Sequence, residues 1–182
     1  MRIISGHHKG RKIRAPKNLP VRPTTDRAKE GLFNILQHRF DLHQAQVLDL
    51  FAGTGNISYE FASRGATQVT AIDQNRHCIQ FIQKTALELE MNISAIQAET
   101  LPFLSQQKTS YDLIFADPPY DFELDVYTKM TEQTTALLNP DGLLIIEHDK
   151  HIDLSQDRIA CQDATWCEQS RLVLILRACP NT

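Results

Sequence analysis

The chain reads Asp49-Leu50-Phe51-Ala52-Gly53-Thr54-Gly55-Asn56 where a short apolar run, 47–51, gives way to a stretch with helical spacing, 57–63. Glycine at positions 53 and 55 leaves room for a ligand to approach the backbone closely. In an open α/β sheet, ligands bind at the carboxyl ends of strands, where such a loop would lie. The segment therefore predicts a ligand-binding loop with contacts from Asp49, Ala52, Gly53, Thr54 and Gly55.

Strand-like and helix-like stretches alternate on both sides of this loop. We expect strands at 47–51, 69–73, 93–97, 111–116 and 143–147, and helices at 57–63, 78–89 and 124–138, the last stopped by Pro140-Asp141-Gly142. Thr24 or Thr25 can cap a further helix that begins at Asp26. The alternation predicts an α/β fold with a mainly parallel sheet, helices on both faces. Two more strands, 158–162 and 172–176, are expected to form an antiparallel hairpin at the sheet edge.

The nature of the ligand follows from two carboxylates. Asp73 ends the second expected strand, where it can accept hydrogen bonds from both hydroxyls of a ribose. A dinucleotide site requires G-x-G-x-x-G, but the third glycine position holds Ser58, and Asp49 would repel a pyrophosphate. A carboxylate suits the ammonium and sulfonium groups of S-adenosylmethionine (AdoMet). The sequence therefore favours AdoMet over a nicotinamide cofactor, with further contacts predicted from Gln74, Glu99 and Thr100.

The tetrapeptide Asp117-Pro118-Pro119-Tyr120 directly follows the fourth expected strand. An exocyclic amino nitrogen on a nucleobase is a poor nucleophile, because its lone pair is delocalised into the ring. The Asp117 carboxylate and the Pro118 carbonyl can accept its two N–H bonds and direct the lone pair at the sulfonium methyl group. The prolines stiffen the loop, and Tyr120 offers a ring on which a flipped base can stack. These four residues are the predicted catalytic site.

Charge is distributed unevenly along the chain. Residues 1–30 contain nine basic and two acidic side chains, a net +7, whereas the remaining residues carry ten basic and twenty acidic ones, a net −10. A cationic segment on an acidic body is typical of a polyanion partner. We therefore divide the chain into a basic N-terminal arm, 1–23, with a hairpin around Gly6–Gly10, and a methyltransferase domain, 24–182. Predicted RNA contacts are Lys9, Arg11, Lys12 and Arg14.

Other features of the composition exclude several classes of protein. No apolar run approaches the roughly 18 residues of a membrane span, and the basic N-terminal segment does not predict a signal peptide. The four cysteines form no C-x-x-C pair and lack zinc-ligand spacing, so free thiols in a reducing cytoplasm are expected, without a metal site.

These motifs resemble the RsmD-like family of bacterial 16S ribosomal RNA guanine 2-amino methyltransferases. The likeness rests on residues 49–55 and 117–120 and on four N-terminal stretches, 1–6, 9–12, 22–27 and 32–36. It implies a class I AdoMet-dependent methyltransferase fold, Rossmann-like, with a seven-stranded sheet. It also implies methylation of one guanine in small-subunit rRNA on a protein-bearing assembly particle, with Arg22, Thr24 and Thr25 near the methionine end of the cofactor. The chain departs from the family at 166–170, where a Tyr-Gly-x-Thr-like turn is usual, and at Glu99, where aspartate is commoner.

Alternative functions remain open at this point. The Asp-Pro-Pro-Tyr chemistry also fits an amino methyltransferase that acts on adenine or cytosine in RNA or DNA. DNA enzymes usually carry a target-recognition insert, for which this chain has no room. A non-catalytic RNA-binding assembly factor would not need the acceptor pair at Asp117. A dehydrogenase is disfavoured by Ser58.

Overall fold

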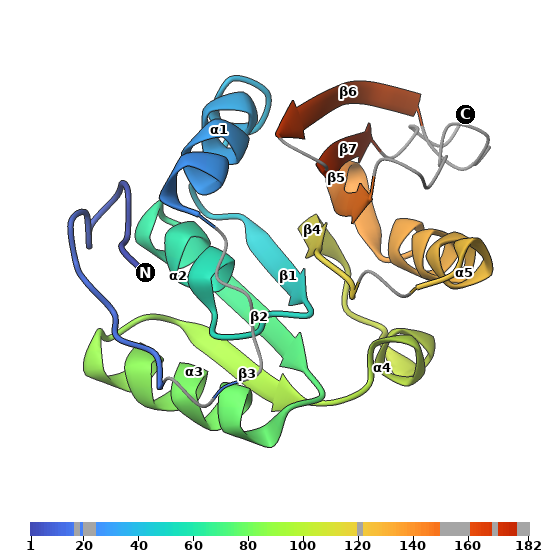
Figure 1. Ribbon diagram of the computed structural model, residues 1–182. Coiled ribbons are helices and arrows are strands. Elements are labelled where there is room, and N and C mark those ends of the chain that lie inside the picture. Colours follow the sequence, from blue (N-terminus) through green and yellow to red (C-terminus); the bar gives the residue numbers. More distant parts are fainter. Residues whose placement is uncertain (17–18, 20–24, 120–121, 150–160, 169–170, 178–182) are drawn as a thin grey trace.

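The computed structural model describes residues 1–16, 19, 25–119, 122–149, 161–168 and 171–177. Within these residues, seven strands form one sheet in the order β3-β2-β1-β4-β5-β7-β6. The elements are α1 (Asp26–Gln37), β1 (Gln46–Leu50), α2 (Asn56–Ser63), β2 (Gln68–Asp73), α3 (Arg76–Glu88), β3 (Ile93–Gln97), α4 (Thr100–Gln106), β4 (Tyr111–Ala116), α5 (Leu124–Thr135), β5 (Leu138–Asp149), β6 (Cys161–Glu168) and β7 (Arg171–Arg177). Figure 1 shows the sheet between two layers of helices.

Strands β1 to β5 pair in parallel, and β7 pairs antiparallel with both β5 and β6. The predicted mainly parallel sheet with an antiparallel hairpin at its edge is therefore confirmed. The described part of the chain contains no helix long and apolar enough to cross a membrane.

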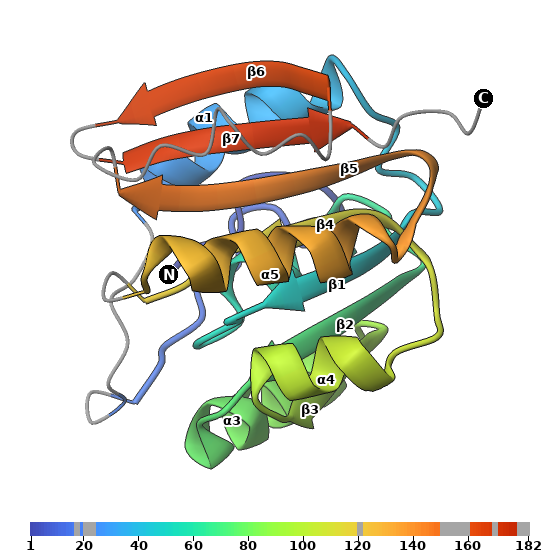
Figure 2. The same ribbon diagram turned by 90° about the vertical axis from the view of Figure 1, so that its right-hand side faces the viewer.

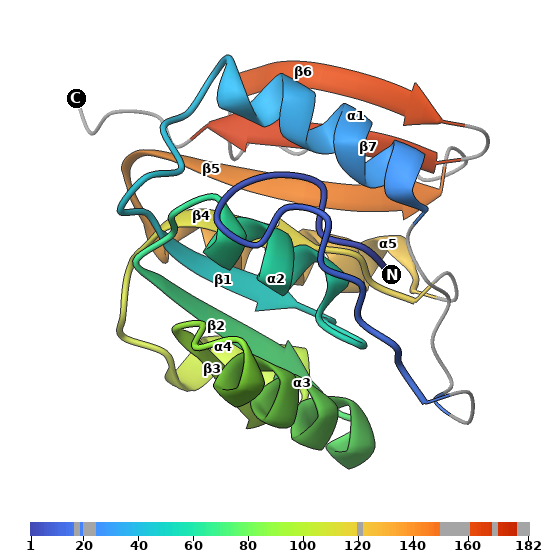
Figure 3. The ribbon, with the colours of Figure 1, turned by 90° about the vertical axis from the view of Figure 1, so that its left-hand side faces the viewer.

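The two faces of the sheet are covered by different helices. Helices α4 and α5 lie on one face (Figure 2), whereas α1, α2 and α3 lie on the other (Figure 3). Successive side chains of a strand point to opposite faces. On β4, Leu113 packs into the cluster beneath α1 and α2, and Ile114 packs into the cluster beneath α4 and α5. The strands are apolar on both sides for this reason, as expected of a doubly covered parallel sheet.

The first thirteen residues form a hairpin, as predicted, that lies against α2 (Figure 3). Arg2 and Lys12 form an antiparallel bridge, and the Ile3 amide donates to the Arg11 carbonyl at 3.0 Å. Ile3 and Ile13 are 1% and 7% exposed and join the core cluster between α2 and α3. This N-terminal hairpin (residues 1–13) is thus anchored in the core of the body. The division at residue 23 remains a prediction, because residues 20–24 lie outside the described chain.

Glu60 fastens the hairpin to α2. Its carboxylate is fully buried and accepts hydrogen bonds from the amides of Ile4 and Ser5 at 2.9 and 3.0 Å. It also pairs with Lys29 and with Arg64. Lys29 contributes to the net charge of +7 from which the sequence predicts a polyanion partner, but its side chain is completely buried. That interpretation is wrong for Lys29, whose charge is used inside the protein.

Two element boundaries differ from the prediction. Helix α5 ends at Thr135, and β5 begins at Leu138, so Pro140-Asp141-Gly142 belongs to a strand and does not stop the helix. Leu138 already pairs with Tyr111 of β4, and the register between these strands shifts before Leu143, so Pro140 enters the strand at an irregularity. A Cβ atom at Gly142 would lie 2.8 Å from the Asn139 carbonyl oxygen, which explains the glycine.

Two further differences are a helix that the sequence pattern missed and a strand that extends beyond its expected end. Helix α4 was not expected; Pro102 lies in its first turn, where a missing amide costs no intrahelical hydrogen bond. The sixth strand runs over Cys161–Glu168, so its overlap with the expected strand at 158–162 is short, and residues 158–160 lie outside the described chain. Trp166 to Glu168, where the family usually has a turn, belong to this strand.

Candidate cofactor and active site

Three aspartates meet where β1, β2 and β4 end. Leu50 of β1 is in register with Ile72 of β2 and with Ala116 of β4. Asp73 closes β2, Asp117 directly follows β4, and Asp49 lies one residue before the end of β1. Both Asp117 and Asp73 act electrostatically on Asp49 and raise its pKa. The structure thus gathers the predicted cofactor carboxylates and the predicted catalytic carboxylate at one edge of the sheet.

The loop between β1 and α2 is bent tightly around its glycines. Gly53 and Gly55 have φ angles of +55° and +80°, a region that residues with a Cβ atom rarely adopt. A Cβ atom at Gly55 would lie 2.9 Å from both Tyr59 Cζ and Ile82 Cγ1, so the close packing of α2 on α3 also requires this glycine. Ala52 and Gly53, at the start of the loop, are half-buried, and Thr54, which follows them, is buried.

Asp73 holds this loop in place. Its Oδ2 accepts a hydrogen bond from the Gly53 amide at 2.8 Å, and its Oδ1 accepts one from the Asn75 amide at 2.7 Å. Each carboxylate oxygen has a second lone pair, so the group can still accept from ribose hydroxyls. Asp73 is half-buried, and the adjacent Gln74 is exposed. The sequence assigned Asp73 a ligand contact but did not indicate that it also orients the glycine loop.

Asp49 is 1% exposed, beneath the loop. Burial raises the pKa of its carboxyl to about 7; the hydroxyl of Ser58 opposes the shift by donating a hydrogen bond, and Asp117 and Asp73 increase it. A cation bound at this edge would stabilise the ionised carboxylates. The group of acidic side chains therefore fits a cationic ligand such as AdoMet and would disfavour a pyrophosphate.

Ser58 has a role that sequence reasoning missed. It counted only as the absence of a third glycine, but it is fully buried and its hydroxyl contacts Asp49 Oδ2. Its position in the first turn of α2 offered a signal, because a residue there can face the end of the strand that precedes the helix. Where a dinucleotide site has its third glycine, this chain thus has Ser58, which donates a hydrogen bond to Asp49.

The catalytic motif leaves β4 at the same edge. Asp117 is half-buried, Pro118 is buried and Pro119 is exposed, whereas Tyr120 lies outside the described residues. The Pro119 carbonyl accepts from the Phe122 amide at 3.3 Å. The ring of Phe122 packs edge-to-face on Phe51, with centroids 5.5 Å apart. This aromatic contact joins the glycine loop to the catalytic loop, and no sequence motif indicated it.

The other predicted contacts surround this edge to different degrees. Glu99 is exposed and occupies the N-cap position of α4, so Thr100 begins a helix. Thr25 caps α1, as predicted, by accepting from the Ala28 amide at 3.1 Å. Arg22 and Thr24 lie outside the described residues. The predicted RNA contacts are all exposed on or next to the N-terminal hairpin, namely Lys9, Arg11, Lys12 and Arg14.

Cysteine and metal chemistry add little to this site. Cys78 is a free, buried thiol, and burial raises its pKa to about 11. Among the described residues, no group of three or more His, Cys, Asp or Glu side chains could hold a metal ion.

A parallel sheet of this order, a glycine loop after β1, an acid that ends β2 and an Asp-Pro-Pro segment after β4 define a class I AdoMet-dependent methyltransferase. The chain belongs to the family described as Conserved hypothetical protein 95, which matches residues 1–170. Together with the relatives named next, this match confirms the resemblance to the RsmD-like family of rRNA methyltransferases.

Known proteins of similar sequence are methyltransferases. The chain is 36% identical over 148 residues to Ribosomal RNA small subunit methyltransferase D of Escherichia coli (strain K12), covering 81% of this chain and 71% of that protein. It is 34% identical over 162 residues to Putative rRNA methyltransferase YlbH of Bacillus subtilis (strain 168), covering 86% of each.

Solved structures agree in fold. The putative methyltransferase yhhF from Escherichia coli superimposes with a TM-score of 0.86 at 26% identity, over 98% of this chain and 97% of that chain. The Thermus thermophilus 16S rRNA N2 G1207 methyltransferase (RsmC), solved with AdoMet and guanosine, superimposes with a TM-score of 0.73 at 22% identity. That match covers 87% of this chain and 45% of the other, and it shows a shared fold.

Proposed function

We propose that this chain transfers a methyl group from AdoMet to the exocyclic 2-amino group of a guanine in small-subunit (16S) ribosomal RNA. The observation that carries the proposal is Asp117-Pro118 at the end of β4, beside the carboxylates of Asp49 and Asp73. The relatives named as rRNA methyltransferases support an RNA substrate.

The chemistry of the transfer is assigned to the catalytic loop. Bound AdoMet supplies an electrophilic methyl group on its sulfonium. The Asp117 carboxylate and the Pro118 carbonyl accept hydrogen bonds from the two N–H groups of the amino nitrogen and so direct its lone pair at that methyl group. Pro118 is buried, which favours a fixed backbone at the acceptor. Tyr120 is assigned to stack on the flipped base.

The cofactor is assigned to the carboxylates and the glycine loop. Asp73 accepts from the ribose hydroxyls, and Glu99 accepts from the adenine amino group, with Gln74 and Thr100 beside them. Asp49 is assigned negative charge near the methionine end, and the family resemblance assigns Arg22, Thr24 and Thr25 to the same end. The loop residues Ala52, Gly53, Thr54 and Gly55 lie along the bound nucleoside.

Guanine is the proposed base because the motifs resemble those of a family of guanine 2-amino methyltransferases, and its 2-amino group offers the two N–H donors that the acceptor pair requires. The name of a relative supports the small ribosomal subunit as the source of the RNA. Adenine and cytosine also carry exocyclic amino groups, so another amino methyltransferase is the alternative. We further propose that the substrate is rRNA in a protein-bearing small-subunit assembly particle, which places the enzyme in the cytoplasm.

Nucleoside analysis tests the proposal directly. Small subunits and naked 16S rRNA from a bacterial strain that lacks its own enzyme of this family are incubated with the protein and methyl-labelled AdoMet. After nuclease digestion, mass spectrometry should find N2-methylguanosine, formed with particles in preference to naked RNA. N6-methyladenosine or a methylated cytosine would support the alternative, and unmodified RNA with both substrates would overturn the proposal.

A further inference from the structure

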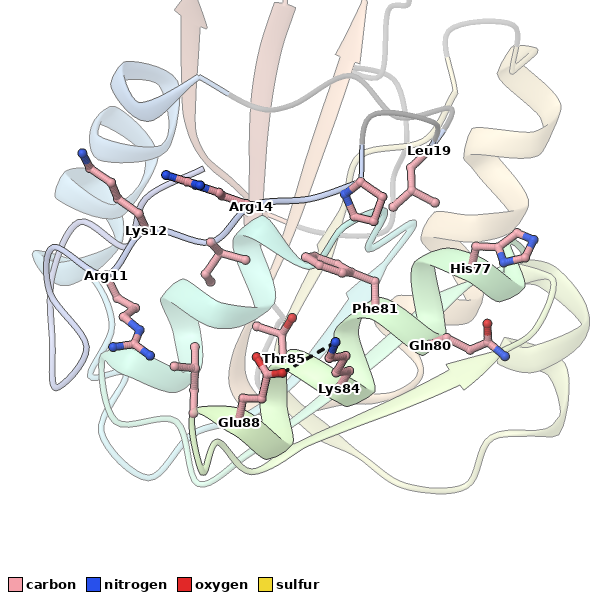
Figure 4. Close-up of a pocket in the computed structure, with 13 residues that line it drawn as sticks. Arg11, Lys12, Arg14, Leu19, His77, Gln80, Phe81, Lys84, Thr85 and Glu88 are labelled. Atoms are coloured by element: carbon pink, nitrogen blue, oxygen red, sulfur yellow. Dashed lines mark ion pairs between the residues drawn. The ribbon is translucent and has the colours of Figure 1, made fainter.

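A groove of about 690 Å³ separates the end of the N-terminal hairpin from helix α3. Figure 4 shows the Phe81 side chain projecting from α3 toward the chain segment that carries Arg14, with Arg11 toward one end of the groove and His77 toward the other. The cofactor and active site described above does not use this groove. Of its lining, the sequence indicated only the basic residues Arg11, Lys12 and Arg14 as RNA contacts, and nothing on α3.

The groove combines an apolar floor with a cationic rim. Ile13 and Leu89 are buried in its floor, and the ring of Phe81 is partly exposed above them. Its described rim carries four exposed cations and one carboxylate, Glu88, the cations being Arg11, Lys12, Arg14 and Lys84. On a chain with a net charge of −3, this concentration of positive charge complements a polyanion.

These features match the requirements of single-stranded nucleic acid. Proteins hold single strands in positively charged grooves in which bases stack on aromatic rings. Phe81 supplies such a ring, and the lysine and arginine side chains lie on both sides of it, on the hairpin segment and on α3 (Figure 4). A groove for an apolar peptide would not need four cations at its rim.

The groove also leads toward the active site. Its α3 end contains His77, four residues after Asp73, which closes β2 at the cofactor edge. We propose that the groove binds a single-stranded RNA segment next to the target nucleotide, with a base stacked on Phe81 and phosphates on Arg11 and Lys84. This inference rests on the proposed function and adds helix α3 to the RNA-binding surface.

Two substitutions on α3 test the groove without altering the hairpin or the active site. Phe81→Leu removes the aromatic face but keeps an apolar side chain. Lys84→Gln removes one charge from an exposed side chain that pairs with Glu88 at 3.8 Å across one helical turn. Lys129→Gln is a matched control, because Lys129 is similarly exposed and pairs with Asp125 at 3.7 Å on α5. The full-length protein is titrated with a fluorescein-labelled single-stranded RNA and with small-subunit particles at several salt concentrations.

Phe81→Leu should weaken RNA binding by about 5- to 150-fold, the effect of removing one base–aromatic stack. Lys84→Gln should lower the slope of log affinity against log salt by about 0.7, as expected for one phosphate contact to a single strand. Lys129→Gln should leave both quantities unchanged, and all three variants should bind AdoMet and unfold thermally like the wild type. If Phe81→Leu unfolds early, Lys84→Gln decides alone.

The proposed RNA site would be overturned if Lys84→Gln kept the affinity and salt slope of the wild type. It would also be overturned if Lys129→Gln lost as much affinity as Lys84→Gln. If the α3 variants lost affinity for the protein-bearing particles but not for the labelled RNA, the groove would bind a protein, and the proposal would again be overturned. These results leave the proposed function standing as long as the wild-type chain methylates guanine in rRNA. Absence of that methylation would instead overturn the proposed function.

Discussion

Lys29 Nζ lies 3.4 Å from Glu60 Oε2, and both side chains are completely buried. The same ammonium donates to the Arg2 carbonyl at 2.6 Å and to Asn56 Oδ1 at 2.9 Å. Asn56 directly follows Gly55 of the cofactor loop. A single buried ion pair therefore joins the N-terminal hairpin, helix α1 and the start of α2.

Removing Lys29 should destabilise the protein strongly. In Lys29→Met, Glu60 loses one of its buried cationic partners, and breaking a buried pair from one side costs about 3–5 kcal/mol. Urea unfolding measures the loss. The double variant Lys29→Met/Glu60→Gln should lose less than the two single variants together, because the buried charge that has lost Lys29 is then also removed. A loss below about 1 kcal/mol in Lys29→Met would contradict this role.

Asp117→Ala should abolish methyl transfer while AdoMet affinity falls far less, because Asp117 is assigned to the amino group of the substrate. The expected loss is roughly 10²–10³ in rate, the scale for one catalytic hydrogen-bonding group. Single-turnover assays at saturating AdoMet measure the rate, and calorimetry measures cofactor binding. Nearly wild-type turnover would refute the assignment.

Asp73→Ala should weaken AdoMet binding by about 1.5–3 kcal/mol, the range for charge-assisted hydrogen bonds. The variant loses the acceptor for ribose and also the acceptor of the Gly53 amide, which orients the loop. Calorimetry measures the dissociation constant, and thermal unfolding without ligand serves as the control for folding. An unchanged dissociation constant would mean that Asp73 has a structural role alone.

Asp49 should make the protein less stable as the pH rises. Burial raises the pKa of its carboxyl from the model-compound value of 3.8 to about 7, so the folded protein holds this proton more tightly than the unfolded chain does. The protonated carboxyl carries no electrostatic cost below pH 3.8; the cost grows through the window up to about pH 7 and is complete above it.

Asp49→Asn removes this ionisation and keeps an oxygen that can accept from Ser58. Urea unfolding of both proteins at pH 5 and pH 8 isolates Asp49 from the histidines, which titrate in both proteins. The free energy of unfolding of the variant minus that of the wild type should be larger at pH 8 than at pH 5. If this difference in unfolding free energy were the same at both pH values, the pKa of Asp49 would not be raised.

Alanine at Lys9, Arg11, Lys12 and Arg14 should weaken RNA binding across sequences, because phosphate contacts position a substrate without selecting its bases. The slope of log affinity against log salt should fall by roughly 0.7–0.9 for each phosphate that the variant no longer binds. AdoMet binding should persist. Alanine at Lys108 and Lys129, two exposed lysines elsewhere, serves as the control. An unchanged affinity and slope in the quadruple variant would mean that RNA is bound by another surface.

Short-range features of the sequence were sufficient for most of the fold. The apolar runs at 47–51 and 111–116 predicted strands buried on both faces. The apolar run at 172–176 predicted the second strand of the antiparallel hairpin at the sheet edge. Thr25 before Asp26 predicted the start of α1, since a hydroxyl there satisfies a free helical amide. The candidate site was predictable because ligands meet the carboxyl ends of parallel strands, where these motifs end.

Long-range contacts decided what the patterns could not. Helix α4 is only seven residues long and contains Pro102, so it is too short to show a helical period, and its position depends on packing against α5. Strand β5 begins before its apolar run because Leu138 pairs with Tyr111. Lys29 has the composition of a surface residue; only the approach of Glu60 and the hairpin backbone provides the partners that permit its burial.

The sequence by itself determined the α/β class, the glycine loop and the acids at the ends of β1 and β2, because each depends on neighbours within a few residues. Only the tertiary structure decided that Ser58 supports Asp49, that Lys29 is internal, and that Phe81 and Lys84 border the same groove as Arg11. These relationships join residues nine to seventy-three positions apart. Burial and charge at such pairs depend on how helices pack on the sheet, which no local pattern specifies.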